Sequence, residues 1–578
     1  MRNPLRFLTQ KKMYGALEPD EIFIDSQNLP EFDTAHLEGR LERPLAPRAF
    51  QRLLGVGVLI GLAVLVQTGS LDIIQHQYFA TWAEENHLRH ESLIAERGRI
   101  IDRNGIPLAA NASESASSTV DVPERVYPLG NAAAQLVGYV SYPKRDQNGN
   151  WYQEEIEGIA GAEQLFDDTL RGENGDRIAE TNAEGKAVSG SVVRDPLPGK
   201  DVVLSIDGDL QKAVYAFVKE RVDASFVGGA ATVMDVQTGE LLALVSYPSF
   251  DPSIMSSGTP KETVQHYIAD SRSPFVDRAV VGLYTPGSIV KPVIASAALA
   301  EGVVTPEKTF VSTGKLVLPN PYNPDKPSIF KDWRANGVVD MRRAIAVSSD
   351  VYFYIVGGGF ENQRGLGISA IDAYAKKFGF GTHTGFPEED EPTGTVPSPQ
   401  WKADHFNGDV WRVGDTYNTS IGQYGWQVTL LQAVRAVSAI ANGGTLVTPT
   451  VEKDKIGNES SVGVTDSKLQ VVREGMRDAV TDGIAQTLST PGLHVAAKTG
   501  TAEVGVQKEL TNSLVIGFFP YEHPRYAFAV ILEHSKAGTL VGAPAVMHNV
   551  LTWIVERRPD MASPTVTLGL TQKYDRIQ

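Results

Sequence analysis

The sequence predicts an α+β fold, because strand patterns near both ends of its large C-terminal part flank a helical middle. Residues 228–248, GGAATVMDVQTGELLALVSYP, have two apolar strands around the turn Val236–Gly239, and a second strand pair covers Ser513–Phe519 and Tyr526–Glu533. The helical patterns between them are Ser288–Ala300, Met341–Val356 and Val428–Ala441. This order favours one antiparallel sheet built from both ends of the domain, with the helices inserted between its strands.

Composition narrows the possible function classes. The chain has 578 residues, of which 42% are hydrophobic and 21% charged, so it can bury cores rather than stay disordered. Its 53 basic and 69 acidic residues give a formal net charge of -16, which disfavours nucleic acid as a partner. The absence of cysteine excludes disulfide frameworks, thiol nucleophiles and cysteine-ligated metal sites.

A single membrane span is predicted near the N-terminus. Residues 53–71, LLGVGVLIGLAVLVQTGSL, carry no charge, and a helix of this length spans about 28 Å, close to the roughly 30 Å hydrocarbon core of a bilayer. A buried core helix is the alternative, but 19 residues without a strongly polar side chain are unusual for one. Basic residues precede the span and acidic residues follow it: Arg40, Arg43, Arg48 and Arg52, then Asp72, Glu84 and Glu85. The positive-inside rule therefore predicts a cytoplasmic N-terminus, an uncleaved anchor in the cytoplasmic membrane and export of everything after residue 71.

The predicted organisation has five parts. They are a cytoplasmic tail over residues 1–52, the anchor over 53–71, a small elongated pedestal domain over 72–205, a large α+β domain over 206–558 and a flexible tail over 559–578. The pedestal is expected to open with a polar helix over residues 72–95, and Asn104-Gly105 within RGRIIDRNGIPLA predicts a hairpin. The stretches GIAGAEQLFDDTLRGENG (158–175) and PGKDVVLSIDGDLQ (198–211) predict a helix and then a strand.

A serine and a lysine three residues apart open one of the predicted helices. In TPGSIVKP, Ser288 and Lys291 lie on one helix face, so the lysine amine can reach the serine hydroxyl. A serine hydroxyl becomes nucleophilic when a neighbouring base takes its proton, and a desolvated lysine can be that base. Free backbone N–H groups at the helix start favour a developing oxyanion. Alone, the Ser-x-x-Lys pattern is weak, because chance matches are common in a chain of this length.

Two further short motifs follow in order along the chain. Ser348 and Asp350 of AVSSDVYFY come 60 residues after Ser288, and Lys498 of VAAKTGTAE comes 150 residues after Ser348. Each motif also has a purely structural interpretation. Ser348 and Asp350 could be a helix-capping serine followed by an acid, and Lys498 could be a solvated lysine at the end of a strand. The joint pattern of Ser-x-x-Lys, Ser-x-Asp and Lys-Thr-Gly is nevertheless specific.

The third motif lies on a short strand of small residues before the last hairpin. Gly500 allows a ligand or another backbone to approach this strand closely. Lys498, together with the hydroxyls of Thr499 and Thr501, suits a carboxylate. In an acidic chain, Lys291 and Lys498 gathered at one cleft predict a local positive pocket for an anionic peptide end.

With these three motifs the sequence resembles the penicillin-binding proteins, and among them the monofunctional class B transpeptidases of bacterial cell-wall synthesis. The resemblance covers nearly all of residues 86–555. It is carried by RGRIIDRNG, GIAGAEQLFDDTLRG, PGKDVVLSID, VMDVQTGELLALVSYPSFDP, YTPGSIVKP, SSDVYFY, WRVGDTYNTSIGQ and AAKTGTAE. Asp350 and FKDWRANGVVDMRRAI make the chain most similar to the elongation-specific penicillin-binding protein 2 group. The resemblance implies a fold like that of penicillin-binding proteins and serine β-lactamases, with a pedestal of the dimerisation type.

The resemblance also implies a role for each motif residue. Ser288 is the acylated nucleophile and Lys291 its proton acceptor. Ser348 and Asp350 form a proton-relay pair that also contacts the substrate. The substrate-binding residues are Lys498, Thr499, Gly500 and Thr501, of which the lysine and the threonines hold the terminal carboxylate of the peptide. The backbone N–H groups of Ser288 and Thr501 form the oxyanion hole.

The chain departs from the family pattern in three places. Relatives often read Ile-Gly-Gln-Gly where this chain ends in Tyr424, so the cleft wall near Tyr424 is expected to differ. Only 28 residues separate Ala109 from Gly138, fewer than usual, which predicts a reduced membrane-proximal head. Some elongation-type relatives hold zinc through Cys and His ligands near the Ser-x-Asp motif, whereas this chain has no cysteine and has Asn336-Gly337 there. We therefore predict no metal and no cofactor.

The predicted function is a membrane-anchored peptidoglycan D,D-transpeptidase that cross-links stem peptides through a serine acyl-enzyme, binds β-lactams and acts in elongation and cell-shape maintenance. The expected partner is a membrane glycan polymerase of the shape, elongation, division and sporulation family, contacted through the anchor. A serine β-lactamase is one alternative, but no acidic loop of the ExxLN type follows the second motif. A catalytically silent scaffold or receptor for wall synthesis is another, although it would need neither Lys291 nor Lys498.

Overall fold

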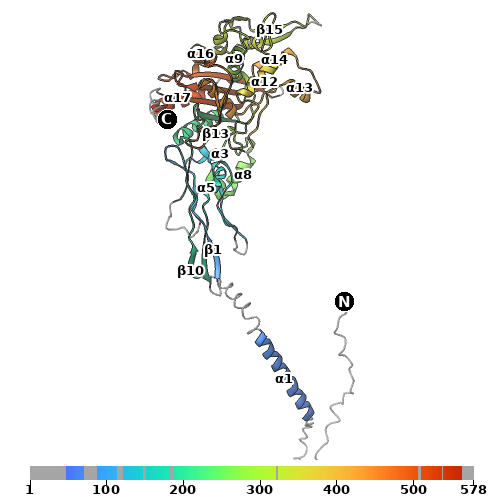
Figure 1. Cartoon of the computed structure of the whole chain (residues 1–578), viewed down its shortest axis with the longest axis vertical. Helices are drawn as coiled ribbons and strands as arrows, with labels where there is room; N and C mark the ends of the chain where they lie inside the picture. Colours follow the sequence, from blue (N-terminus) through green and yellow to red (C-terminus); the bar gives the residue numbers. More distant parts are fainter. Residues whose placement is uncertain are drawn as a thin grey trace, which may run out of the picture. The chain divides into compact units, whose positions relative to one another are not determined.

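The computed structural model describes residues 47–70, 88–112, 122–146, 151–181, 187–320, 323–388, 390–505, 509–536, 538–539 and 541–562. It divides into two units, residues 1–88 and 89–578. In the first unit, helix α1 (Pro47–Gly69) is exposed, and its part Phe50–Gly69 is long and apolar enough to cross a membrane (Figure 1). Residues 53–69 of the predicted anchor thus lie in one helix, whereas the predicted tail before residue 47 lies outside the described residues.

The second unit begins with the strands of the pedestal. One sheet has the order β1 (Leu88–Leu93), β9 (Gly175–Thr181), β10 (Ala187–Arg194). The helix predicted over residues 72–95 is thus wrong from Leu88 onward, and its part over residues 72–87 lies outside the described residues. A second sheet has the order β11 (Val202–Val203), β2 (Ile100–Ile101), β3 (Pro107–Asn111), β4 (Arg125–Val126). The predicted hairpin is confirmed, because β2 and β3 pair antiparallel across a turn in which Gly105 has φ +89°.

Shorter elements complete the pedestal. They are η4 (Gly130–Ala133), α3 (Ala134–Val137), β5 (Val140–Ser141), β6 (Lys144–Arg145), β7 (Trp151–Gln153), β8 (Glu157–Gly158), α4 (Gly161–Leu165) and α5 (Asp167–Leu170). The helix predicted within residues 158–175 is thus present as two short helices. The strand predicted within residues 198–211 is limited to β11, and helix α6 (Gly208–Ser225) follows it, capped by the Asp207 side chain.

A buried ionic cluster joins pedestal segments that are distant in sequence. Arg97 Nε lies 2.6 Å from Glu163 Oε2, and Arg125 Nε lies 2.8 Å from Glu163 Oε1. The second guanidinium nitrogen of Arg97, Nη2, lies 2.7 Å from Asp167 Oδ1. The side chains of Arg97 and Glu163 have no exposed surface, so losing either would leave an uncompensated buried charge. The cluster thus connects Arg97 of RGRIIDRNG with Glu163 and Asp167 of GIAGAEQLFDD.

The large domain is built on a five-stranded antiparallel sheet. Its order is β13 (Leu241–Tyr247), β12 (Gly228–Asp235), β22 (Tyr526–Lys536), β21 (Leu510–Phe519), β20 (Ala496–Val504). Both predicted strand pairs lie in this sheet, and β12 pairs directly with β22, which confirms that strands from the two ends of the domain meet. Figure 1 shows early strands in green and the late part of the chain in orange to red.

Helices cover both faces of this sheet. In β12, Ala230 and Met234 pack in the core that includes α9 (Lys291–Ala300) and α15 (Leu430–Ala441). The alternate residues Ala231 and Val233 pack in the core formed with α6 and α17 (Ala543–Arg557). Successive strand side chains point to opposite faces, and burial on both faces explains why β12 is mostly apolar and is buried along its whole length.

The three predicted helices are present with altered boundaries. The first starts as the 3-10 helix η5 (Gly287–Val290) and continues as α9. The single helix predicted over Met341–Val356 is wrong, because the chain forms α10 (Met341–Ala346) and α11 (Asp350–Gly358) with a turn between them. Ser348 in this turn has φ +55°, a left-handed conformation that interrupts a helix. The third, α15, starts at a capping box of Thr429 and Gln432.

The remaining helices are α7 (Pro252–Ser257), α8 (Lys261–Ala269), α12 (Ile368–Lys377), α13 (Pro399–His405), α14 (Val413–Ser420), α16 (Asp466–Asp482), η6 (Gln486–Leu488) and α18 (Pro559–Ala562). Three small two-stranded antiparallel sheets pair β14 (Phe310–Ser312) with β17 (Gly337–Val339), β15 (Lys315–Leu318) with β16 (Ser328–Lys331), and β18 (Thr445–Val447) with β19 (Glu459–Ser461). Met561 in α18 is buried, so ordered structure continues past residue 558, where the C-terminal tail was predicted to begin.

Candidate active site

Ser288 and Lys291 lie at the junction of η5 and α9. Gly287 before them has φ +55°, and its N–H donates to the carbonyl of Gly422 at 3.0 Å. Ser288 is partly exposed, whereas Lys291 is fully buried and its Nζ lies 5.5 Å from the centre of the Phe353 ring. The short helix therefore presents the serine near the surface and places the lysine amine beneath it.

The turn between α10 and α11 brings the second motif to Lys291. Lys291 Nζ donates to Ser348 O at 2.9 Å, to Ser348 Oγ at 3.1 Å and to Asp350 Oδ1 at 2.6 Å. Among the described residues, Ser348 and Asp350 are its hydrogen-bond partners and Ser288 is not one of them. The predicted reach from Lys291 to Ser288 is thus not a hydrogen bond in this structure.

Lys498 of the third motif contacts the same Ser348 hydroxyl as Lys291. Lys498 Nζ donates to Ser348 Oγ at 2.8 Å and to Thr499 O at 2.8 Å. Lys498 is fully buried and lies within β20, so the alternative of a solvated strand-end lysine is wrong. Burial, and then the neighbouring charge of Lys291, hold the pKa of Lys498 well below its usual value, while Asp350 acts in the opposite direction.

Two glycines let strand β20 pack closely against η5. A Cβ atom on Gly500 would lie 2.8 Å from both Pro286 O and Ile289 Cγ2, and one on Gly287 would lie 2.9 Å from Thr501 O. The prediction that Gly500 permits close approach of another backbone is therefore confirmed, and that backbone is the one carrying Ser288. Thr501 is exposed and Thr499 partly exposed, so both are accessible beside the nucleophile's segment.

Two family models match this chain. The model described as penicillin binding protein transpeptidase domain matches residues 229–552, which is more than half of the chain. The chain belongs to the penicillin-binding protein transpeptidase family. The model described as penicillin-binding protein dimerisation domain matches residues 115–204. With both domains present, and with MrdA and PBP2 proteins among its relatives, the chain is a class B penicillin-binding protein of the PBP2 type.

Similar proteins agree with this assignment. The peptidoglycan D,D-transpeptidase MrdA of Acinetobacter baumannii is 30% identical over 473 residues, which cover 76% of this chain and 67% of the relative. The crystal structure of Pseudomonas aeruginosa PBP2 in complex with WCK 5153 matches with a TM-score of 0.66 and 29% identity, over 83% of this chain and 99% of that one. A structure titled for the coordination of polymerization and crosslinking by a peptidoglycan synthase complex matches with a TM-score of 0.67 and 25% identity, over 86% and 97%.

Tyr424 gives this penicillin-binding protein an aromatic cluster beside the segment that holds Gly287. Tyr424 has φ +67°, in the left-handed region that favours glycine, and lies two residues after Gly422. Its ring packs on Phe406, Trp401 and Trp411, with centroid distances of 6.1, 5.7 and 5.8 Å. Tyr424 thus joins Phe406, Trp401 and Trp411 in one aromatic cluster.

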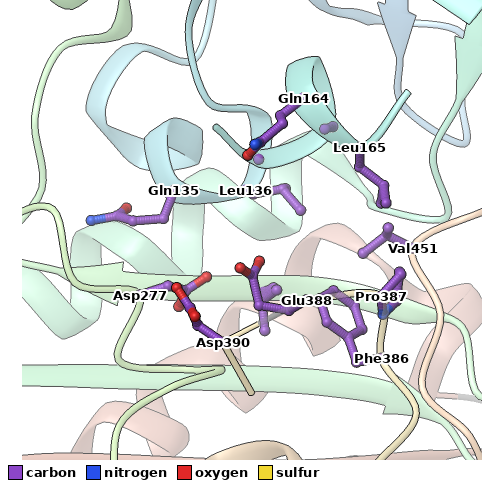
Figure 2. Close-up of a pocket in the computed structure, with 13 residues that line it drawn as sticks. Gln135, Leu136, Gln164, Leu165, Asp277, Phe386, Pro387, Glu388, Asp390 and Val451 are labelled. Atoms are coloured by element: carbon purple, nitrogen blue, oxygen red, sulfur yellow. The ribbon is translucent and has the colours of Figure 1, made fainter. Parts of the chain in front are cut away.

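A separate pocket lies between pedestal residues and the large domain. Gln135, Leu136, Gln164 and Leu165 line it from the pedestal, and Asp277, Glu388 and Asp390 contribute carboxylates from the large domain (Figure 2). Burial, reinforced by Glu388, raises the pKa of Asp277 to about 6.

Among the described residues, no group of three or more His, Asp or Glu side chains is arranged to hold a metal ion.

Sequence reasoning missed Asp332, which is buried next to the Ser-x-Asp turn. It stands in FKDWRANGVVDMRRAI, a segment used above only as a subgroup marker. No spacing rule connects it to the three motifs, because it reaches them through side-chain contacts across several elements.

Proposed function

We propose that this peptidoglycan D,D-transpeptidase forms its acyl-enzyme on Ser288. The observation that supports the assignment is the convergence of Lys291 and Lys498 on Ser348 Oγ, at the base of the helix that begins with Ser288. Three motifs separated by 60 and 150 residues along the chain thus form one polar centre. It contains an alcohol for attack, two amines for proton transfer and backbone N–H groups for an oxyanion.

Acylation begins when Ser288 Oγ attacks the penultimate D-alanine carbonyl of a stem peptide and its proton passes to Lys291. This transfer requires an uncharged Lys291 amine that turns from a present partner toward Ser288. Two ammonium groups at one hydroxyl repel each other, and after burial the charge of Lys291 is a cause of the lowered pKa of Lys498. Ser348 Oγ lies between the two amines, with Lys291 Nζ at 3.1 Å and Lys498 Nζ at 2.8 Å, so it can pass a proton from one to the other.

Ser348 supplies the proton for the leaving group. Its oxygen accepts hydrogen bonds from both lysines, which occupies its two lone pairs and leaves its own O–H free to point outward. When the bond from the acyl carbon to nitrogen breaks, the amine of the terminal D-alanine takes this proton, and a lysine restores it. The amine of a neighbouring stem peptide then attacks the ester and gives up a proton, which Lys291 passes to Ser288 Oγ as the ester bond breaks, so the cross-link forms and Ser288 is released.

The edge of the sheet provides the substrate groove. Strand β20 is the last strand of the five, so its outer backbone groups can pair with an extended stem peptide. Thr499 and Thr501 bind the terminal carboxylate through their hydroxyls. Because Lys498 is buried, it acts on that carboxylate as a positive charge beneath the strand rather than as a surface contact.

The membrane topology and the partner are also proposals. The apolar helix α1 and the basic residues before it support a single span with the N-terminus in the cytoplasm and residues 72–205 and 206–558 exported as pedestal and transpeptidase domains. The two matched family regions fall within these boundaries. The similarity to a peptidoglycan synthase complex supports a separate membrane glycan polymerase as partner during elongation.

Intact-mass measurement with penicillin over time tests the acyl-enzyme. The wild-type protein is expected to gain the mass of one penicillin and to keep it, and Ser288→Ala to gain none. Ser296→Ala on the same helix is the control, because this buried serine donates only to Pro292 O in its own helix. Undiminished labelling of Ser288→Ala would overturn the assignment, and rapid release of hydrolysed penicillin would indicate a β-lactamase instead.

A further inference from the structure

Asp332 is a buried carboxylate that collects hydrogen bonds from several elements. Its side chain lies after strand β16, and the residue is 9% exposed. Oδ2 accepts from Ser312 Oγ at 2.9 Å, from Ser349 Oγ at 2.9 Å, from Val351 N at 3.1 Å and from Asn336 Nδ2 at 3.2 Å. Oδ1 accepts from Trp333 N at 2.9 Å. One carboxylate therefore links β14, the loop after β16 and the start of α11.

The next residue holds the other side of the same turn. Trp333 Nε1 donates to Val347 O at 3.1 Å. Together, Asp332 and Trp333 bond to residues 347, 349 and 351, which surround Ser348 and Asp350 on both sides. Ser348 has φ +55°, a conformation that costs a non-glycine residue about 1 kcal/mol or more and persists only where its surroundings hold it.

The hydrogen-bond donors around Asp332 suit a negatively charged carboxylate. Among the described residues its partners are hydroxyls, an amide and backbone N–H groups, and one of these is the N–H of Val351 in the first turn of α11. A helix N-terminus favours a negative charge, so the carboxylate stabilises the helix exactly where Asp350 begins it. Rotating Asp332 away would leave Ser349 and Val351 without their acceptor inside the protein.

We propose that Asp332 is a positioning residue for acylation, which holds Ser348 and Asp350 in reach of Lys291 and Lys498. It touches neither the nucleophile nor the substrate in this arrangement and acts through the turn that it anchors. This inference rests on the proposed function, because it requires that Ser348 and the lysines move protons for Ser288.

The test separates the affinity for penicillin from the acylation rate constant k2 by stopped-flow measurement with a fluorescent penicillin over a range of concentrations. Asp332→Ala is expected to lower k2 by about 100-fold and to leave the Kd within about threefold, because misplacement near 1 Å has effects of that size on the chemical step. Asp332→Asn keeps one acceptor oxygen and is expected to restore about tenfold of that loss. A role in binding alone would change the Kd instead.

Asp102→Asn is the matched control. Asp102 is also fully buried and accepts from the backbone N–H groups of Asn104, Ile106 and Gly208, but it lies in the pedestal. This variant is expected to lower Tm without changing k2. If the two aspartate variants lower k2 equally, general destabilisation explains the effect and the proposal is wrong.

Two further variants keep the test decisive if Asp332→Ala does not fold. Trp333→Phe removes the bond to Val347 O and shortens the half-exposed ring on which Arg334 stacks, and it is expected to lower k2 by about threefold or more. In a Ser348→Ala background, Asp332→Asn is expected to lower k2 by less than twofold, because its action passes through Ser348. The inference would be overturned if the effects of Asp332→Asn and Ser348→Ala on k2 were fully additive. It would also be overturned if folded Asp332→Asn and Trp333→Phe both had the wild-type k2. Failure of the wild-type protein to react with penicillin would instead overturn the proposed function.

Discussion

Gly500 controls how closely the third motif approaches the nucleophile's helix, so Gly500→Ala is a direct perturbation of the site geometry. The added Cβ would lie 2.8 Å from Pro286 O and 2.8 Å from Ile289 Cγ2. The isoleucine methyl group can rotate away, but the carbonyl belongs to the backbone two residues before Ser288. Strand β20 and η5 must therefore separate.

The size of the effect follows from these distances. Ordinary contact begins at 3.4 Å, so the strand and η5 must separate by about 0.6 Å. Displacements approaching 1 Å slow reactions by about 100-fold, and we expect acylation of Gly500→Ala to be about 10 to 100 times slower than in the wild type. Overpacking of this kind also costs about 1 to 3 kcal/mol of stability, which lowers Tm by a few degrees.

The assay is the rate of covalent labelling by a fluorescent penicillin, measured with Tm on the same preparations. Gly190→Ala in β10 is the control, because a Cβ there would meet its nearest neighbour, Arg177 Cδ, at an ordinary 3.4 Å. This variant is expected to label at the wild-type rate. Wild-type labelling by Gly500→Ala, or equal slowing of both variants, would refute the packing argument.

Two other predictions follow from buried titratable groups. Lys498→Met keeps the buried stem but removes the amine, so acylation is expected to fall at least about 100-fold in labelling assays. Because the pKa of Lys498 is lowered in the fold, the unfolded chain binds more protons at pH values between this lowered pKa and 10.5, and wild-type stability rises with pH across that window. The methionine variant is therefore expected to lack this slope and to match or exceed the wild-type Tm at pH 7. Asp277→Asn is expected to stabilise the protein above pH 6, because the pKa of Asp277 is about 6 in the fold and 3.8 without it. The gain is at most about 3 kcal/mol, less because the side chain is partly exposed, and thermal unfolding should show it vanish below about pH 4.

Each of these has a contradicting outcome. Wild-type acylation by Lys498→Met would show that the buried amine takes no part in catalysis, and a large loss of Tm would show that it is structural. If Asp277→Asn is stabilising by the same amount at pH 4 and pH 7, the effect is not the protonation of Asp277. The isosteric amide keeps the oxygen that accepts from Ala279 N, so a lost hydrogen bond does not confuse the comparison.

Several features were predictable from the sequence, either because a short stretch shows the pattern by itself or because several motifs are specific when taken together. The strand pairs around residues 228–248 and 513–533 show apolar runs bounded by turn residues, and both lie in the sheet. The three motifs were recognisable together, although Ser-x-x-Lys alone was weak. Gly500 was predicted to permit close approach, but only the structure identifies the approaching backbone as that of Pro286.

Other features depend on contacts that no local pattern contains. Residues 341–356 have an apolar helical pattern without glycine or proline, and the break at Ser348 is held by Lys291 from another helix and by neighbours bonded to Asp332. The burial of Lys498 follows from packing of helices over β20, which a single strand sequence does not show. The strand β1 is polar, so its pairing with β9 overrides the expected helix.

Peptide mapping of the penicillin adduct tests the central claim most directly. Wild-type protein is labelled with penicillin and digested, and tandem mass spectrometry locates the added mass. A single adduct is expected on Ser288, in a peptide that stays unmodified in Ser288→Ala. An adduct on Ser348, Ser349 or any other residue of the wild-type protein would contradict it.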